Sequence, residues 1–134
     1  MRAAGVLAVS ILILGSAGCA SMDTPIVPKP GQELRPFAVG WEQFFTIDWQ
    51  PTERNGRPTL EGMVVSRFGA SATRVQLLVD ALDESGRVID QRVIWLGRSI
   101  GPFDRSEFST PVTKAPKYRV SMFAYDWRDK GGGV

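Results

Sequence analysis

Hydrophobic and polar residues alternate one by one over most of the chain after residue 40, a pattern typical of strands that bury one face of a sheet. Phe45, Ile47 and Trp49 share one side of one such segment, while Asp90 and Arg92 interrupt the apolar positions of another. Helical periodicity is nearly absent. The alternation predicts strands at about residues 42–50, 58–67, 73–82, 87–97, 105–110 and 117–127.

Turn-forming residues separate these segments. Asn55-Gly56 and the run Asp83-Glu84-Ser85-Gly86 supply the positive-φ positions that hairpin turns need, and Gly101-Pro102 breaks the chain between two strands. Short strands joined by frequent turns predict an all-β fold, a small antiparallel β-sandwich of six or seven strands over residues 39–128. We expect residues 129–134, which include three consecutive glycines, to be a disordered tail.

A second pattern occupies the first twenty residues. A positive start at Met1-Arg2 precedes an apolar run from Ala3 to Leu14, and small residues then lead to Cys19, the only cysteine. This order is typical of an export signal. The run is too short to cross about 30 Å of hydrocarbon as a helix that rises 1.5 Å per residue. We therefore expect residues 1–18 to be a cleaved signal peptide, with an uncleaved anchor as an alternative.

Ala17, Gly18 and Cys19 resemble the end of the bacterial lipoprotein signal, whose lipobox reads Leu, a small residue, Gly or Ala, and Cys; Ser16 replaces the usual Leu. The resemblance implies that Cys19 is the lipid attachment site, bearing acyl chains such as palmitate. Ala20 stands where an Asp often retains such proteins at the inner membrane, so the resemblance favours the outer membrane, facing the periplasm. Cleavage after Ala20 would instead release a soluble periplasmic protein.

Proline is concentrated just after this cysteine. Residues 19–38 hold four of the nine prolines, at positions 25, 28, 30 and 36. Such a composition favours extended, polyproline-like backbone, which spans about 50 Å here at roughly 3.1 Å per residue. We therefore expect residues 19–38 to be a lipid-anchored linker between the membrane and the sandwich.

The segment from about Leu60 to Tyr125 resembles the small immunoglobulin-like modules of the FxLYD type, which occur in bacterial and archaeal envelope proteins. The strand that names the family aligns with residues 79–83, where Asp83 is the identical position. A Gly101-Pro102 corner that leads to Phe108 and a closing strand over residues 118–123 match the later landmarks. These are landmarks of the fold, so the resemblance implies that the sandwich is immunoglobulin-like and transfers no chemistry.

The residue inventory removes most catalytic chemistry. The chain has no histidine, and its one cysteine is assigned to the lipid. Ser-His-Asp and Cys-His catalysis and zinc sites are thereby excluded. We expect a protein that is not an enzyme, with no catalytic residue, no cofactor and no metal site.

Carboxylates keep one catalytic alternative open, a divergent hydrolase that uses acids alone. The candidate pairs lie at the ends of predicted strands, and a further adjacent pair lies in a predicted hairpin turn that offers too few oxygens for calcium. These pairs are Asp104 with Glu107, Asp126 with Asp129, and Asp83 with Glu84.

The aromatic cluster Trp41, Phe44, Phe45 and Trp49 is the feature most open to a functional interpretation. Tryptophans on a sandwich face can stack on sugar rings, and peptidoglycan is the glycan of the periplasm. The alternation of Phe45, Ile47 and Trp49 favours core packing instead. We keep a peptidoglycan-binding module based on Trp41 or Trp49 as the alternative function.

Charge gives no sign of a polyanionic partner. The chain has 16 basic and 14 acidic residues, and its arginines are scattered, so we expect no nucleic-acid binding. An anchor, a linker and a sandwich without catalytic chemistry predict an accessory or structural protein of the cell envelope. We expect it to hold a protein partner, with an exposed edge strand as the contact.

Overall fold

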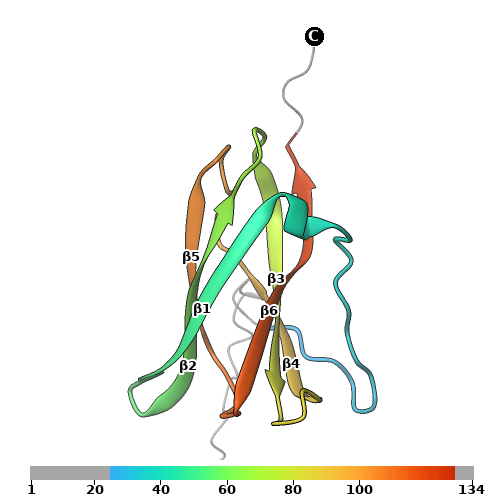
Figure 1. The fold of residues 1–134 in the computed structure, drawn as a ribbon, viewed down its shortest axis with the longest axis vertical. Helices are drawn as coiled ribbons and strands as arrows, with labels where there is room; N and C mark the ends of the chain where they lie inside the picture. Colours follow the sequence, from blue (N-terminus) through green and yellow to red (C-terminus); the bar gives the residue numbers. More distant parts are fainter. Residues whose placement is uncertain (1–24, 129–134) are drawn as a thin grey trace, which may run out of the picture.

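The computed structural model describes residues 25–128, which form six strands and one short 3-10 helix (Figure 1). The elements are η1 (Trp41–Gln43), β1 (Phe45–Arg54), β2 (Arg57–Ser66), β3 (Ala72–Leu82), β4 (Val88–Trp95), β5 (Arg105–Pro111) and β6 (Lys117–Trp127). All six predicted strands are confirmed. The predicted signal peptide, Cys19 and the predicted tail lie outside the described residues.

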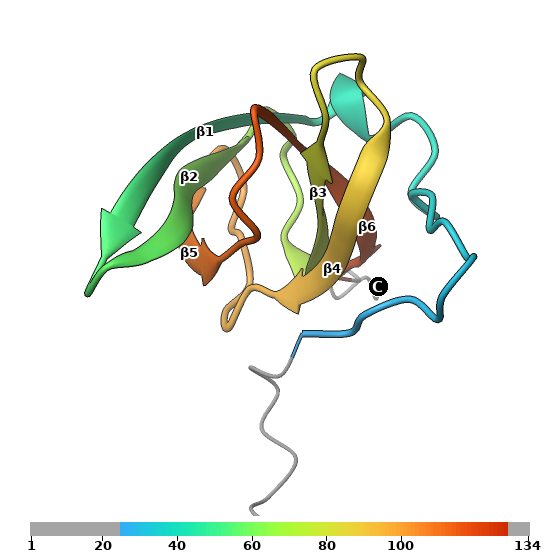
Figure 2. The ribbon, with the colours of Figure 1, turned by 90° about the horizontal axis from the view of Figure 1, so that it is seen from below.

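The strands form two antiparallel sheets of three strands each, with the orders β1-β2-β5 and β4-β3-β6. The two sheets pack face to face (Figures 1 and 2). The chain changes sheet after β2, after β4 and again after β5, as it does in immunoglobulin-like sandwiches. The predicted all-β, immunoglobulin-like β-sandwich is therefore confirmed.

A tyrosine at the corner between the last two strands strengthens this assignment. Tyr118 lies at the start of β6, and its hydroxyl donates to the carbonyl oxygen of Thr113 at 2.8 Å. The same hydroxyl accepts a hydrogen bond from the backbone N–H of Ala115 at 3.0 Å. A tyrosine at this corner that bonds back to the preceding backbone is a hallmark of immunoglobulin-like sandwiches.

Replacing Tyr118 by phenylalanine is expected to lower the free energy of unfolding by about 1–2 kcal/mol, because both hydrogen bonds of the hydroxyl are lost while the ring stays. Urea denaturation of the chain from residue 19 onward, with Cys19→Ser, measures the loss. Tyr125→Phe is the matched control, since the Tyr125 hydroxyl makes no hydrogen bond within residues 25–128. Equal stability of Tyr118→Phe and the parent chain would contradict the corner's role.

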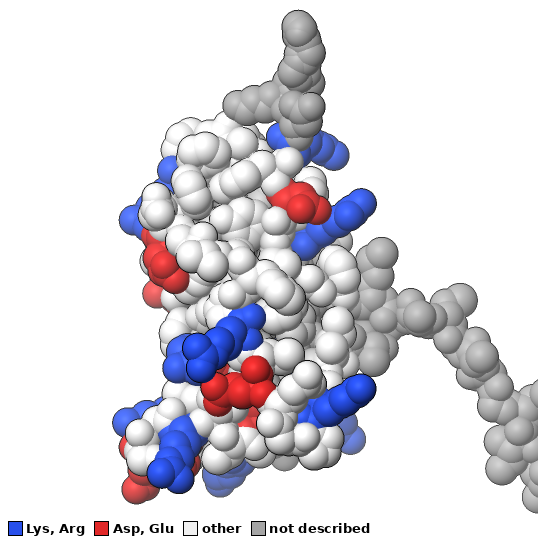
Figure 3. Space-filling view, turned by 90° about the vertical axis from the view of Figure 1, so that its right-hand side faces the viewer, with Lys and Arg blue, Asp and Glu red and all other residues white. Residues whose placement is uncertain are grey.

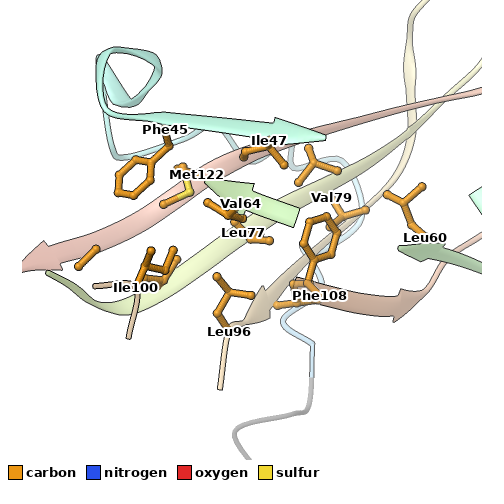
Figure 4. Packing of buried hydrophobic residues seen from close by; sticks show 14 of the residues in the cluster. Phe45, Ile47, Leu60, Val64, Leu77, Val79, Leu96, Ile100, Phe108 and Met122 are labelled. Atoms are coloured by element: carbon orange, nitrogen blue, oxygen red, sulfur yellow. The ribbon is translucent and has the colours of Figure 1, made fainter. Parts of the chain in front are cut away.

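The core lies between the two sheets and is built from every strand (Figure 4). β1 and β2 contribute alternate residues, as the period of a strand requires when one face is buried. Leu96 and Ile100, in the connection between β4 and β5, also belong to this core. Its labelled members in Figure 4 are Phe45, Ile47, Leu60, Val64, Leu77, Val79, Leu96, Ile100, Phe108 and Met122.

β1 continues four residues beyond its predicted end and includes Pro51. Asn55 and Gly56, both with positive φ, form the two-residue turn to β2, so Arg54 and Arg57 are a hydrogen-bonded pair. Counting back from Arg54, Pro51 falls at a position whose N–H would point away from β2. Proline costs no ladder hydrogen bond there, because β1 is an edge strand.

Residues 25–38, part of the expected linker, lie against the outer face of the β4-β3-β6 sheet, and we call them the strap (Figure 2). At its start, the backbone N–H groups of Ile26 and Val93 donate to each other's carbonyl oxygens at 2.9 and 2.8 Å. At its end, the N–H groups of Phe37 and Ala38 both donate to the carbonyl oxygen of Phe123. The strap thus binds β4 and β6, the two edge strands of this sheet.

The middle of the strap is held by the side chain of Gln91 in β4. The backbone N–H of Leu34 donates to Oε1 of Gln91 at 2.7 Å, and Nε2 of Gln91 donates to the carbonyl oxygen of Leu34 at 2.9 Å. Nε2 also donates to Oδ1 of the buried Asp80 at 2.9 Å, which fixes the orientation of the amide. Leu34 packs on an apolar cluster of this outer face, made of Leu78, Val93 and Phe123.

Candidate functional site

The carboxylates considered for catalysis are not gathered into one site. Asp104 belongs to the turn before β5, where its Oδ1 accepts a hydrogen bond from the N–H of Arg105 at 2.8 Å. Asp126 lies 3.8 Å from the exposed Arg74, and Asp129 is outside the described residues. Within residues 25–128, no three acidic side chains lie close enough to share a metal ion.

Asp83 is a turn residue, as the hairpin interpretation predicts. One of its carboxylate oxygens, Oδ1, accepts hydrogen bonds from the N–H and hydroxyl of Ser85 and from the N–H of Arg87. The N–H of Gly86, whose φ is 90°, donates to the carbonyl oxygen of Asp83. The carboxylate is therefore engaged by its own loop.

This turn predicts a pH dependence of stability. The hydroxyl of Ser85, followed by the N–H of Arg87, holds the pKa of Asp83 below its usual value of 3.8. A lowered folded-state pKa stabilises the fold above pH 4, and the stabilisation is lost as the pH falls through the folded pKa. Thermal unfolding between pH 5 and pH 2 should therefore show a smaller acid destabilisation in Asp83→Asn than in the parent chain, and equal pH profiles would contradict this expectation.

Most of the aromatic cluster packs as core. Phe45 is buried, and Trp41 and Phe44 are half-buried against the core. Phe45 stacks on Trp127 with ring centroids 5.6 Å apart and contacts Tyr125 edge to face. The core interpretation is confirmed for these rings.

Trp49 is the member of the cluster that does not belong to the core. It is 36 % exposed and borders a shallow hollow of about 600 Å³. Neighbouring positions on all three strands of the β1-β2-β5 sheet line the rest of the hollow. They are Asp48, Gln50, Arg54, Glu61, Gly62, Met63, Glu107, Phe108 and Ser109.

The strand register explains why these residues meet. Asp48, Met63 and Glu107 are direct cross-strand neighbours on β1, β2 and β5. They alternate with buried residues such as Ile47 and Val64, so their row lies on the outer face of the sheet. In the next row, the ring of Phe108 lies so close to Gly62 that an added Cβ would be 2.5 Å from its Cζ. Glycine at this position thus lets the Phe108 ring pack across β2.

The charges around the hollow are mainly acidic. Arg54 forms an ion pair with Glu61, and its Nε donates to Oε2 of Glu61 at 2.6 Å. Asp48 and Glu107 take part in no ion pair within the described part of the chain. The hollow therefore has Met63 between two carboxylates on the outer face, with Trp49, which lies on the other side of β1, at its border.

The edge strands are less open than the sequence predicts. In the β4-β3-β6 sheet, the strap occupies backbone groups of Val93 in β4 and of Phe123 in β6. In the other sheet, Pro51 removes a donor from the free edge of β1, and Nη1 of Arg92 donates to the carbonyl oxygen of Pro111 in β5. Interrupted edges of this kind resist the addition of another strand. The uncovered outer face of β1-β2-β5 is the more accessible surface.

Comparison with known proteins adds no relative. No family model, curated protein or solved structure matches this chain. No helix within residues 25–128 has the length and apolar character needed to cross a bilayer.

Proposed function

We propose that this protein is a lipid-anchored component of the bacterial cell envelope whose sandwich binds a protein partner and catalyses no reaction. Acyl chains on Cys19 hold it in the membrane, preferentially the outer membrane with the domain in the periplasm. The lipobox-like residues Ala17, Gly18 and Cys19 support the anchor. The hollow beside Trp49 supports the binding role and is the observation that carries it.

The two outer faces of the sandwich differ in a way that favours this hollow. The strap covers an apolar cluster on the outer face of the β4-β3-β6 sheet, whereas Met63 remains accessible on the outer face of the β1-β2-β5 sheet. Trp49, on the opposite side of the edge strand β1, is accessible at the border of the hollow. Tryptophan is enriched among the residues that dominate binding energy at protein interfaces, and methionine adapts to partners of different shape. A hollow with such a centre and a charged rim has the anatomy of a protein-binding site.

Charge complementarity narrows the chemistry of the partner. Asp48 and Glu107 flank Met63 and form no ion pair within residues 25–128. Arg98 and Arg105 border a neighbouring hollow on the Glu107 side. A lysine or arginine of the partner would be paired by these carboxylates, and an arginine could also stack on the Trp49 ring. We therefore expect a partner segment that combines an apolar side chain with a basic one.

Replacing Trp49 by alanine is expected to weaken partner binding about 30-fold, equivalent to about 2 kcal/mol for a central interface tryptophan. A photocrosslinking residue at position 63 in the acylated protein, in living cells, identifies the partner. Titration of that purified partner then gives the affinities of the parent and Trp49→Ala proteins.

Phe103→Ala is the matched control, because Phe103 is 70 % exposed and lies outside the hollow. It should bind like the parent. Glu107→Lys should weaken binding and should also reduce its dependence on salt. A partner that binds Trp49→Ala and the parent chain equally would refute the hollow as its site.

A glycan is the second candidate ligand, favoured by the exposure of Trp49 beside the amide of Gln50 and the carboxylates of the hollow. An aromatic ring with a few converging polar groups is typical of small-ligand sites. Co-sedimentation of the protein with purified peptidoglycan sacculi tests it. Binding that Trp49→Ala abolishes would replace the protein partner by a glycan, and no sedimentation would remove this candidate.

Mass spectrometry of the mature N-terminus tests the anchor separately. An acylated Cys19 is the expected result, and Cys19→Ser should lack the acyl mass. A mature chain that begins at Ser21 without lipid would show a soluble periplasmic protein instead.

A further inference from the structure

The strap determines how far the sandwich can lie from its anchor. An extended linker over residues 19–38 would allow about 50 Å. The strap instead keeps residues 25–38 on the sheet through the backbone of Ile26, the side chain of Gln91 and the carbonyl oxygen of Phe123. Only six residue steps separate Cys19 from Pro25, and at about 3.6 Å each they span at most about 22 Å.

The place where the strap begins decides which side of the sandwich is nearest to the anchor. Pro25 borders the groove between β4 and β5, and Ile26 is paired with β4. Figure 2 places the strap on the opposite side of the sandwich from β1 and β2. A short connection to the lipid therefore brings the β4 side to the bilayer and leaves β1, with Trp49, directed away from it.

The surface near this connection carries exposed aliphatic side chains. Ile26 is 49 % exposed, Val27 59 % and Ile89 51 %. Val27 and Ile89 border the same hollow between the strap and β4. We call these three residues the aliphatic patch. Figure 3 shows that charges of both signs are scattered over the side of the molecule that bears the strap, with wide uncharged areas between them.

We infer that the aliphatic patch rests on the lipid surface when Cys19 is acylated, so that the strap orients the sandwich as well as shortening its tether. This inference rests on the proposed lipid anchor. Aliphatic side chains at an interface gain by leaving water, and the nearby acyl chains keep them within reach of the lipid. The result is a fixed presentation of the Trp49 hollow to partners in the periplasm.

Fluorescence quenching by brominated lipids tests the orientation. Because acylation blocks Cys19, a single cysteine introduced by Ile89→Cys or Gln50→Cys is the one site for an environment-sensitive probe. The acylated proteins are reconstituted in vesicles of phosphatidylethanolamine with a minority of phosphatidylglycerol. We expect quenching about twofold stronger or more at position 89 than at position 50, which is exposed on β1 beside the Trp49 hollow and does not border the groove near Pro25.

Val27→Asp is the variant that separates contact from mere proximity. Val27 is exposed, so the change leaves the core intact, and a carboxylate at the lipid surface should lower the quenching at position 89 to that at position 50. Equal quenching at both positions in vesicle-bound parent protein, or no effect of Val27→Asp, would overturn the inference. Failure of the anchor itself is distinguished by mass spectrometry and by flotation with the vesicles, because an unacylated protein would lack the acyl mass and remain unbound.

Discussion

Truncation of Phe45 to alanine is expected to lower the free energy of unfolding by about 3–5 kcal/mol. Phe45 is buried at the start of β1, where it joins the main core cluster. Its ring stacks on Trp127 at an interplanar angle of 9° and meets Tyr125 with ring centroids 5.0 Å apart. Alanine would leave a cavity between the two sheets and remove both ring contacts, which contribute beyond the buried area.

Urea denaturation followed by tryptophan fluorescence measures this loss, since Trp127 lies in direct contact with the changed side chain. Phe103→Ala is the matched control and should change stability by less than about 0.5 kcal/mol, because Phe103 is largely exposed. Phe45→Leu should give an intermediate loss, since leucine refills part of the cavity. Similar losses for Phe45→Ala and Phe103→Ala would contradict the assignment of the core.

Replacement of Asp80 by alanine is expected to cost about 3 kcal/mol and to loosen the strap. The carboxylate is 1 % exposed, and its Oδ2 accepts hydrogen bonds from Nε and Nη2 of Arg119 at 2.9 and 2.7 Å. Its Oδ1 accepts from Gln91, the residue that holds Leu34. Removing one partner of a buried ion pair typically costs 3–5 kcal/mol. The lower end applies here, because the Arg119 side chain is 55 % exposed and can regain water.

Two measurements separate the parts of this prediction. Denaturation gives the global loss, and hydrogen exchange of the Leu34 amide reports the strap, since that N–H bonds to Gln91. Asp80→Asn keeps an acceptor for Gln91 and should slow the exchange of Leu34 relative to Asp80→Ala. Asp126→Ala is the control for a surface pair, because Asp126 and Arg74 are exposed and 3.8 Å apart, and it should cost below about 1 kcal/mol. Unchanged exchange of Leu34 in Asp80→Ala would contradict the coupling of Asp80 to the strap.

The strands were predictable because the alternation within each segment and the turn residues at its ends indicate a strand without reference to the rest of the chain. Asn55-Gly56 and the run 83–86 form the turns that their residue types favour, and the alternation around Ile47 matches the buried face of β1. The end of β1 was less predictable. Pro51 reads locally as a strand breaker, and it is tolerated because β1 has a neighbour on one side. That neighbour relation exists only in the assembled sheet.

The candidate site was predictable in part. The sequence singled out Trp49, but its alternation with Phe45 and Ile47 favoured the core, and the structure leaves it at the edge of the hollow instead. Alternation specifies the side of a strand on which a residue lies, whereas exposure also depends on whether the opposite sheet reaches that position. The cross-strand row of Asp48, Met63 and Glu107 joins three distant segments, so no local pattern could reveal it.

The sequence alone determined the six strands, their turns, the sandwich and the lack of histidine-based and thiol-based chemistry, because residue types and a period of two act over a few neighbouring positions. Only the tertiary structure decided where residues 25–38 lie. Leu77, Leu78 and Val79 are buried in succession, which shows that β3 is covered on both faces, by the opposite sheet and by the strap. The prolines of the strap favour extended backbone in either case, but its position depends on Val93, Gln91 and Phe123, which are distant in sequence and meet it only in the folded chain.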